Sequence, residues 1–555
     1  MVTQPQTADM ATTQRERGVL LTLAAAQFLM TLDSSVMNVS IATVATDLGT
    51  TVTGIQTAIT LYTLVMATLM LTGGKVGAII GRRRAFMLGC VIYAAGSFTT
   101  AVAPNLAVLL IGWSLLEGVG AALIMPGVVA LVAGNFGPQA RPRAYGLVAA
   151  AGAIAVAVGP LIGGAVTTFV SWRLIFVAEV IIALTILLLA SRIRDVPPRS
   201  GARLDGVGSC LSVVGLGLAV FGVLRSSVWG WILPKPDAPQ VFGISAVAWL
   251  ILTGLVVLWG LVAWETRQEQ QGKDALVRPS MFKNRQLVGG LTMFFFQYFV
   301  QAGIFFTIPL FLSVVLQLSA LETGARLVPL SLALLLSALA VPRLWPTASP
   351  RRMVRVGLVL LLAASILLIG ALNADATPSA VTVPLIFVGL GIGTLASQLA
   401  AVTVSSVPDE ESSEVGGLQN TALNLGASLG TALVGSVLIA ALGTLFLQCV
   451  LLHPNIPDTL KSDAEITLGA GVPFVSDTQL SADLAAYGVP DQTIQDVLIV
   501  NSSARLSALR AAIFVVAVVA AIALLFAGSI PTLPPGTPGT AVDDGEHLPE
   551  AALAE

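Results

Sequence analysis

The chain has 555 residues, of which 55% are hydrophobic and only 10% are charged, and its formal net charge is −2. Because a soluble protein typically carries about 25% charged residues, this composition excludes an ordinary soluble globular protein. The near-neutral charge gives no basic surface for a nucleic acid partner. The three cysteines fit neither a disulfide framework nor the spacing of a metal site, so we expect no bound metal or other cofactor.

Apolar runs long enough to cross about 30 Å of hydrocarbon as helices recur along the chain. The runs show no alternation of polar and apolar residues, so they are helices and not strands of a membrane barrel. The first run is too long for the core of a signal peptide, and we expect it to be retained. We predict an all-α polytopic protein with fourteen transmembrane helices, at 18–45, 54–78, 84–103, 106–134, 143–170, 173–191, 205–225, 242–264, 287–316, 322–342, 353–372, 382–404, 415–446 and 508–530.

The distribution of Lys and Arg tests this arrangement, because cytoplasmic loops carry an excess of these residues. With the N-terminus in the cytoplasm, 21 of the 28 Lys and Arg residues lie on the inner side and 7 on the outer side. The bias holds in both parts of the chain, and a wrong span count would scramble it in one of them. We therefore predict an even number of spans with both termini in the cytoplasm.

The spans divide the chain into two halves that carry a weak internal repeat. A basic inner loop follows the second span and another follows the tenth, and each half contains one helix rich in small residues. Two similar halves around a central site are typical of secondary transporters. We predict a cytoplasmic tail at 1–17, a six-helix half at 18–191, a linker with two extra helices at 192–286, a second six-helix half at 287–530 with an outer loop at 447–507, and a disordered cytoplasmic tail at 531–555.

The fifth span carries the pattern Gly-x6-Gly-Pro-x-x-Gly-Gly, formed by Gly152, Gly159, Pro160, Gly163 and Gly164. Glycines four residues apart let another helix approach closely, and a proline inside a helix favours a kink. One interpretation of this pattern is that it serves only the packing of helices. However, the pattern is a complete match to the motif of antiporters, and in this respect the chain resembles the major facilitator superfamily.

The first span adds Leu32-Asp33-Ser34-Ser35-Val36-Met37-Asn38-Val39, which is similar to the first-helix signature of the fourteen-span drug:proton antiporter branch. The Ser171-Trp172-Arg173 sequence before the sixth span and the extra helix pair between the halves also fit that branch. The resemblance covers about residues 18–530. It implies the major facilitator fold and proton-coupled antiport that exports small lipophilic or amphipathic compounds. The Arg-rich, Lys-poor composition indicates a GC-rich bacterial genome, so we expect the protein in the bacterial plasma membrane.

The loop after the second span departs from the superfamily motif. Ala78 stands where the family has an acid, and Ile79 where it has a basic residue. The charge relay that latches the family's inner gate is therefore in doubt. Four residues keep the motif and form our predicted inner-gate loop: Gly74, Gly81, Arg82 and Arg83. The two arginines either act in gating or only anchor the loop in the cytoplasm.

Ionisable side chains inside a span are costly and usually functional, and three acids qualify: Asp33, Glu117 and Glu179. Glu117 stands where the family has a glutamine, and Ser114 replaces the arginine of the same span, so a carboxyl has been gained and a cation lost. We predict that the three acids couple transport to protons, since burial disfavours their charged forms. The alternative is that they only bond neighbouring helices.

Pairs of amides lie four residues apart in two spans, so each pair shares one helix face. Gln297 and Gln301 lie in the ninth span, among many aromatic residues, and Asn420 and Asn424 lie in the thirteenth. We predict that they line the substrate cavity, and the alternative is hydrogen bonding between helices. The acidic run Asp409 to Glu414 before the thirteenth span is interpreted as a helix cap.

Other functional classes find less support in the sequence. No Gly-x4-Gly-Lys-Ser/Thr loop is present for an ATP-driven pump. The two histidines lie in the outer loop and the tail, so we predict neither an enzyme nor a nucleotide-binding protein. Uptake of a metabolite by proton symport remains an alternative, as does a non-transporting receptor or assembly protein that uses the outer loop. The expected partners are a small-molecule substrate, protons and the lipid bilayer.

Overall fold

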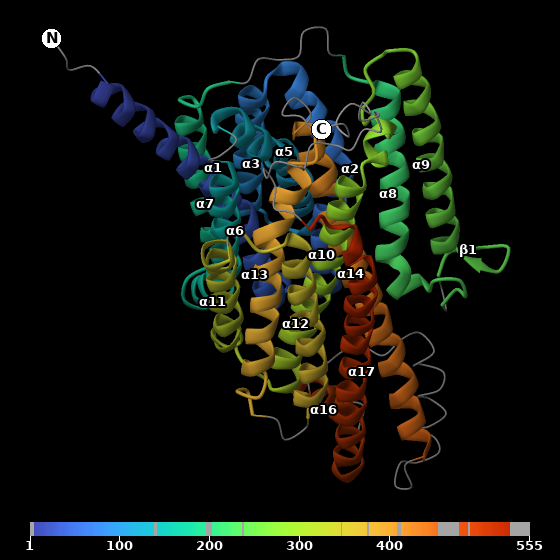
Figure 1. Ribbon diagram of the computed structural model, residues 1–555. Coiled ribbons are helices and arrows are strands. Elements are labelled where there is room, and N and C mark those ends of the chain that lie inside the picture. Colours follow the sequence, from blue (N-terminus) through green and yellow to red (C-terminus); the bar gives the residue numbers. More distant parts are fainter. Residues whose placement is uncertain are drawn as a thin grey trace, which may run out of the picture.

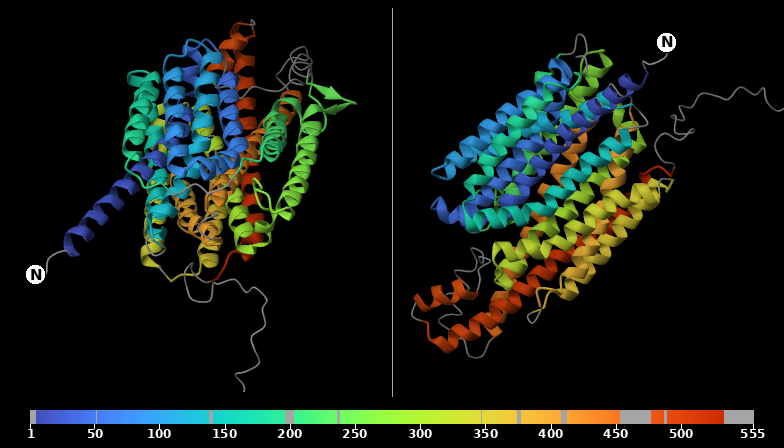
Figure 2. Two further views of the ribbon diagram at one scale, coloured as in Figure 1. Left: turned by 90° about the horizontal axis from the view of Figure 1, so that it is seen from above. Right: turned by 90° about the vertical axis from the view of Figure 1, so that its left-hand side faces the viewer.

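The computed structural model describes residues 5–50, 52–137, 141–195, 203–235, 238–345, 347–373, 377–407, 412–452, 477–486 and 489–532. Nearly all of this part of the chain is helical, and long helices run side by side in two bundles (Figures 1 and 2). The prediction of an all-α polytopic fold is confirmed.

The first bundle contains the helices before residue 191, drawn blue to teal in Figure 2. Helix α1 packs against α6 and α7, and α3 lies between α5 and α7. The elements are α1 (Pro5–Asp47), α2 (Val52–Ile80), α3 (Arg82–Ala101), α4 (Leu106–Leu109), the π-helical turn η1 (Leu110–Glu117), α5 (Gly118–Asn135), α6 (Arg141–Phe169) and α7 (Arg173–Ala190).

The second bundle contains the helices after residue 279, with α13 between α11 and α12 and with α14 against α10 and α17. A large apolar core fills it. The elements are η2 (Pro279–Lys283), α10 (Arg285–Leu310), the π-helical turn η3 (Phe311–Val315), α11 (Ala320–Leu344), α12 (Pro350–Ala371), α13 (Thr382–Val404), α14 (Ser412–Leu452), α16 (Asp477–Ala486), α17 (Asp491–Phe526) and η5 (Ala527–Ser529).

Two further helices, α8 (Gly206–Trp229) and α9 (Ala246–Gln270), lie beside both bundles at the right of Figure 1. A short antiparallel hairpin of β1 (Gln240–Val241) and β2 (Ile244–Ser245) connects them. Helix α8 contacts both α2 and α14, whereas α9 packs on α8. The extra pair therefore lies against the first bundle and the second bundle at once.

Several helix starts follow from local sequence. Asn105 accepts from Val108 N at the start of α4, and Asp205 accepts from Gly208 N at the start of α8. Ser319 and Glu322 form a reciprocal capping box at the start of α11. Each cap satisfies backbone N–H groups that a helix leaves without partners in its first turn.

Thirteen helices in the described part of the chain are long and apolar enough to cross a membrane. They correspond to thirteen of the fourteen predicted spans. The remaining prediction, 84–103, coincides with α3, which is a helix of 20 residues packed between α5 and α7. Helix α3 begins with three arginines and contains several Gly, Ser and Thr residues, which makes it less apolar than the other helices.

Two predicted boundaries need correction. The outer loop predicted at 447–507 is shorter, because α14 continues to Leu452 and α17 begins at Asp491. Short helix α16 packs against α17, with Asp477 paired to the buried Arg505. The N-terminal tail predicted at 1–17 is helical from Pro5, as a continuation of α1. The predicted tail at 531–555 lies almost entirely outside the described residues.

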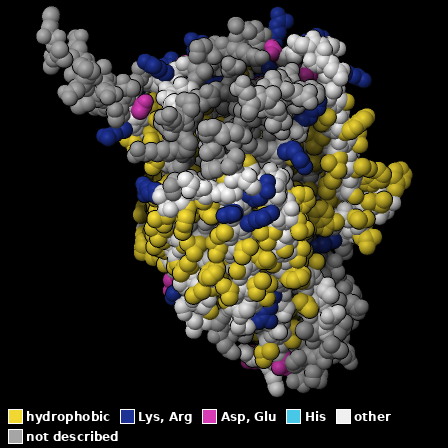
Figure 3. All heavy atoms as spheres, in the orientation of Figure 1, with side chains coloured by type: hydrophobic (Ala, Val, Ile, Leu, Met, Phe, Trp, Pro, Cys, Tyr) yellow, Lys and Arg dark blue, Asp and Glu magenta, His cyan; other side chains and the backbone are white. Residues whose placement is uncertain are grey.

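The surface matches a membrane protein. On the face shown in Figure 3, hydrophobic side chains form a broad band across the middle of the molecule. Lys and Arg side chains lie mostly above that band, toward the end at which α1 begins in Figure 1. An apolar belt of this kind suits a hydrocarbon surround, with the charged residues in water.

Candidate functional site

Three carboxyl groups from three different elements meet inside the first bundle. Asp33 lies on α1, Glu117 ends the π-helical turn η1, and Glu179 lies on α7. All three are buried, with relative exposures of 1%, 0% and 1%. One carboxylate oxygen of each lies within 4.8 Å of the others. The structure therefore brings together the three acids that the sequence predicts, and we call them the carboxyl cluster.

Asp33 is bound by an aromatic pair. The indole Nε1 of Trp113 donates to Asp33 Oδ1 at 2.8 Å. The Trp113 ring stacks on Tyr62, with ring centroids 5.1 Å apart and an interplanar angle of 7°. Within the described residues, the other Asp33 oxygen and the Tyr62 hydroxyl are buried with no hydrogen-bond partner. Sequence analysis missed both aromatic residues, although an aromatic ring with a polar atom inside a span is a signal for such a role.

The two glutamates are bound by hydroxyl groups. Thr100 Oγ1 lies 3.3 Å from Glu117 Oε1, and Glu179 Oε2 accepts from Tyr93 at 3.1 Å and Ser97 at 3.4 Å. The second oxygen of each glutamate is buried with no partner among the described residues. These neutral donors orient the carboxyl groups without supplying a positive charge.

Local backbone features place Glu117 at this point. A Cβ on Gly96 of α3 would lie 2.7 Å from Glu117 Cγ, so only a glycine leaves room for this side chain. Glu117 also ends an eight-residue π-helical stretch. Such stretches are rare and are frequent at functional sites. The turn and the glycine together explain how a glutamate fits between tightly packed helices.

The glycine motif of α6 faces the helix that carries Asp33. A Cβ on Gly159 would lie 2.4 Å from Ser35 Oγ, and a Cβ on Gly163 would lie 3.0 Å from Val36 Cα. Helix α6 also meets α11 of the second bundle, and we call this boundary between the bundles the seam: the carbonyl oxygen of Pro160 lies 2.7 Å from the Cβ position of Gly324 on α11. Helix α6 therefore contacts α1 beside Asp33 and also the second bundle.

No Lys or Arg side chain is paired with the carboxyl cluster among the described residues. Among the ion pairs between described residues, none includes Asp33, Glu117 or Glu179. In the described part of the chain, these are also the side chains that could together hold a metal ion. Chemically, the cluster can bind protons or another small cation, because one oxygen of each acid lies within 4.8 Å of the others and each acid has one oxygen without a partner among the described residues.

Comparison with known proteins decides the family. The model of the Major Facilitator Superfamily matches residues 23–431. The chain belongs to this superfamily. It is 31% identical to the puromycin resistance protein of Streptomyces alboniger, over 75% of this chain and 81% of that protein. It is 28% identical to the multidrug efflux pump LfrA of Mycolicibacterium smegmatis, over 76% of this chain and 80% of that pump.

A further relative is the tetracenomycin C resistance and export protein of Streptomyces glaucescens, at 26% identity over 77% of each chain. These relatives confirm the predicted resemblance to the drug-export branch of the superfamily. Among solved structures, an auto-inhibited peptide transporter of the POT family matches with a TM-score of 0.54 and 15% identity, over 95% of this chain and 99% of that chain. A likeness at this identity shows the shared fold alone.

The predicted substrate-binding amides of this superfamily member lie on two helices that pack together, α10 and α14. Gln297 is buried and Gln301 is partly buried, and the carbonyl oxygens of both have no partner among the described residues. Asn420 and Asn424 donate to carbonyl groups one turn back in α14, at 2.8 Å each. Their role in substrate binding stays a prediction.

The residues of the predicted inner-gate loop lie at the end of α2 and the start of α3. Gly81 has a φ of +102° and is the N-cap residue immediately before α3. Arg83 bonds the end of α7 within the first bundle, through Asp195, Ser191 and Ile193. The described contacts of Arg83 therefore fasten the loop inside its own bundle and do not latch the two bundles.

Lys75 of α2, which the sequence analysis counted only as an inner-side charge, contacts the second bundle. Its ammonium group lies 3.5 Å from Glu414 at the start of α14. Glu414 belongs to the acidic run that was interpreted only as a helix cap. The interpretation was incomplete, since a residue at a helix start can also pair with a cation 339 positions away.

On the opposite side of the membrane region, Trp172 and Arg173 bind Asp47 at the end of α1. The Trp172 indole donates to Asp47 Oδ2 at 3.0 Å, Arg173 pairs with the same carboxylate, and Arg173 Nη2 donates to Ala103 O at 2.9 Å. The Arg173 guanidinium and the indole N–H hold the pKa of Asp47 below its usual value of 3.8. The Ser-Trp-Arg sequence thus joins α1, α3 and α7.

Proposed function

We propose that this protein is a proton-coupled antiporter that exports small lipophilic or amphipathic compounds, antibiotics among them. The family match supports transport of a small molecule. The three relatives described above are named for resistance to puromycin, for tetracenomycin C export and for multidrug efflux. We extend these activities to the present chain as a proposal about the class of cargo.

The observation that carries the coupling is the carboxyl cluster. Two unit charges 4.8 Å apart repel each other by about 3–4 kcal/mol at an effective dielectric constant of about 20. Three charged carboxylates in a buried site would also lose most of their hydration. Neutral donors bond them and no described cation pairs with them, so the cluster retains protons that a change in access can exchange.

The proton cycle follows from this chemistry. Protons enter the cluster when it faces the outside, and cargo leaves in exchange. When the cluster faces the cytoplasm, protons leave and the site binds new cargo. Helix α6 supports this exchange, because it contacts α1 beside Asp33 and α11 across the seam. A movement of one bundle relative to the other would therefore also displace α1, the helix that carries Asp33.

We place the protein in the bacterial plasma membrane, with both termini in the cytoplasm and with α3 as the fourteenth span. The excess of Lys and Arg on one side supports this orientation. Two six-helix halves, at 18–191 and 287–530, would then flank the extra pair. We propose transport and not catalysis as the activity, with the α10 and α14 amides lining the path of the cargo.

Transport into inverted membrane vesicles tests this function. We would energise the vesicles by acidifying their interior and measure accumulation of puromycin or ethidium in wild type and in Asp33→Asn. Glu322→Gln is the matched control, because it removes a carboxylate from the exposed capping box while glutamine preserves that cap.

Wild type and Glu322→Gln are expected to accumulate drug only with the proton gradient, and Asp33→Asn is expected to fall to the level of empty vesicles. Equal accumulation by Asp33→Asn and wild type would contradict proton coupling through the cluster. Gradient-driven loss of drug from the vesicles, in place of accumulation, would point to the symport alternative.

A further inference from the structure

The extra helix pair lies over the seam between the two bundles. Helix α8 contacts α2 of the first bundle and α14 of the second. The hydroxyl groups of Ser226 on α8 and Ser436 on α14 lie 3.0 Å apart in a buried contact. Helix α9 packs on the outside of α8, and the chain then passes from α9 back toward the seam.

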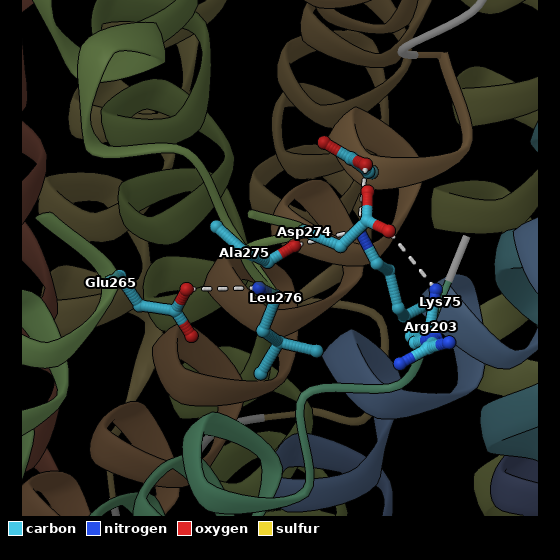
Figure 4. Close-up of polar contacts among 7 residues, drawn as sticks. Lys75, Arg203, Glu265, Asp274, Ala275 and Leu276 are labelled. Carbon is cyan, nitrogen blue, oxygen red and sulfur yellow. Dashed lines mark hydrogen bonds and ion pairs between the residues drawn. The ribbon is translucent and has the colours of Figure 1, made fainter. Parts of the chain in front are cut away.

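The returning segment inserts one peptide group between the side chains of Lys75 and Glu265. Lys75 Nζ of α2 donates to the carbonyl oxygen of Ala275 at 2.6 Å. The N–H of Leu276 donates to Glu265 Oε2 of α9 at 2.9 Å. These two groups belong to the same peptide unit, so an ammonium and a carboxylate bind its two ends (Figure 4).

This arrangement is electrostatically favourable. A trans peptide unit points its C=O and N–H in opposite directions, so its dipole runs from the Lys75 side to the Glu265 side. The Lys75 bond has a charged donor, which makes it stronger than a bond between neutral groups, and the Glu265 oxygen accepts from the Leu276 N–H in either protonation state of the carboxyl group. Lys75 and Glu265 are 3% and 2% exposed, so water screens these bonds little.

The same ammonium group also reaches the second bundle. Lys75 Nζ lies 3.5 Å from Glu414 Oε1 at the start of α14, and Glu414 is 9% exposed. Lys75 thus bonds the linker and α14 together. The chain of contacts runs from α9 through the 275–276 peptide and Lys75 to α14.

An apolar layer surrounds this chain of contacts. Val277 of the linker and Met281 of η2 pack in it with side chains from both bundles. Val415, next to Glu414, is completely buried there, and the bundle residues of the layer include Leu71, Leu287, Leu291, Val415 and Leu418. The linker is therefore part of the packed closure between the bundles and does not only connect them.

We propose that the extra helices form a third part of the inner gate, in which Glu265 positions Lys75 through the 275–276 peptide and so holds Lys75 against Glu414. The proposal rests on the proposed transport function. For cargo to enter from the cytoplasm, α2 and α14 must separate, and the Lys75 contacts must break. Release of the linker by α8 and α9 is then a step of gate opening.

Cysteine accessibility at Val415 tests the proposal. In a chain whose three cysteines are replaced by serine, we would introduce Val415→Cys and measure its labelling by a membrane-impermeant maleimide in inside-out vesicles. The test variants are Glu265→Ala, Glu265→Gln, Lys75→Met and the double variant Glu265→Ala with Lys75→Met. Thr266→Ala is the matched control, because the Thr266 hydroxyl bonds Val262 O within α9.

Glu265→Ala is expected to raise the labelling rate several-fold. Glu265→Gln is expected to label as slowly as the parent, because its amide oxygen still accepts from Leu276 N. Lys75→Met is expected to raise the labelling rate at least as much as Glu265→Ala. The double variant is expected to label no faster than Lys75→Met alone, because both changes break the same chain of contacts.

Unchanged labelling in Glu265→Ala together with raised labelling in Lys75→Met would overturn the role of the extra helices. Additive increases in the double variant would also overturn it, because they would show two independent contacts. Circular dichroism and size-exclusion profiles identify any variant that fails to fold. Glu265→Gln keeps an oxygen that accepts from Leu276 N, so it separates the loss of this bond from the loss of the carboxyl group. Labelling needs neither cargo nor a proton gradient, so a failure here is distinguishable from a failure of proton coupling.

Discussion

Asp33 accepts its hydrogen bond from an indole, although a charged carboxylate would usually be paired with a cation in a buried site. Trp113 fixes the orientation of Asp33 while leaving the second carboxylate oxygen free to take a proton. Tyr62, stacked on Trp113, extends this support to α2. At the scale of residues, neutral side chains orient the acids of the carboxyl cluster, and bound protons neutralise their charge.

Trp113→Phe tests this support. Phenylalanine keeps a ring against Tyr62 but removes the N–H donor, so we expect a stability loss of about 1–3 kcal/mol and impaired drug-driven proton exchange. Thermal unfolding in detergent and vesicle transport measure the two effects. Trp264→Phe is the control, because Trp264 Nε1 donates to Asp205 away from the cluster. Equal transport by both variants would show that the Asp33 bond has no part in coupling.

Asp47 predicts a pH dependence of stability. Arg173 and Trp172 lower its pKa in the folded protein below 3.8. The ionised carboxylate therefore stabilises the fold above that pH, and this contribution disappears as the pH falls through the folded pKa. The thermal midpoint of wild type should exceed that of Asp47→Asn at pH 7, and the two should converge as the pH falls below 3.8. A constant difference over that range would rule out this linkage.

At the scale of elements, the sequence predicted which segments are helices better than where they end. Apolar runs mark only the part of a helix that lies in hydrocarbon, so the polar first part of α17 was assigned to a loop. The π-helical turn at Glu117 has no hydropathy signal. The individual acids were predictable because charge inside a span is rare, but their convergence depends on helix rotations that a single sequence does not specify.

The α6 glycines give a prediction at this scale. Gly159→Ala would place a Cβ 2.6 Å from Ser35 Cβ, which forces α1 away from α6. We expect a destabilisation of about 1–3 kcal/mol and a marked loss of transport. Gly146→Ala on the same helix is the control, because no atom lies within 4 Å of its Cβ position. Unfolding and vesicle transport that are equal in the two variants would contradict close packing of α6 on α1.

At the scale of the whole molecule, two bundles meet along seams formed by α6 with α11 and by α2 with α14. At the first seam, α6 also contacts α1 beside Asp33. The second seam contains Lys75, and the linker packs there. The sequence indicated two halves, but it did not indicate that α8 lies across the seam. Contacts between residues hundreds of positions apart leave no local pattern, which is why Glu414 was assigned only a capping role.

The proposed orientation makes a whole-molecule prediction. A fluorescent protein that matures only in the cytoplasm should fluoresce when fused to the C-terminus and stay dark when inserted at Gly243, in the hairpin between α8 and α9. Alkaline phosphatase fusions at the same two sites should show the reverse activity. Fluorescence at both sites would contradict the orientation.

Proton release on drug binding tests the central claim most directly. Purified protein in weakly buffered detergent would receive a saturating dose of puromycin or ethidium, and a pH indicator would report the protons released per protein. Wild type and Glu322→Gln are expected to release protons, and Asp33→Asn, Glu117→Gln and Glu179→Gln to release fewer, because each change removes an acid from the carboxyl cluster. Drug binding that releases the same number of protons from all five proteins would contradict a proton site made of these three acids.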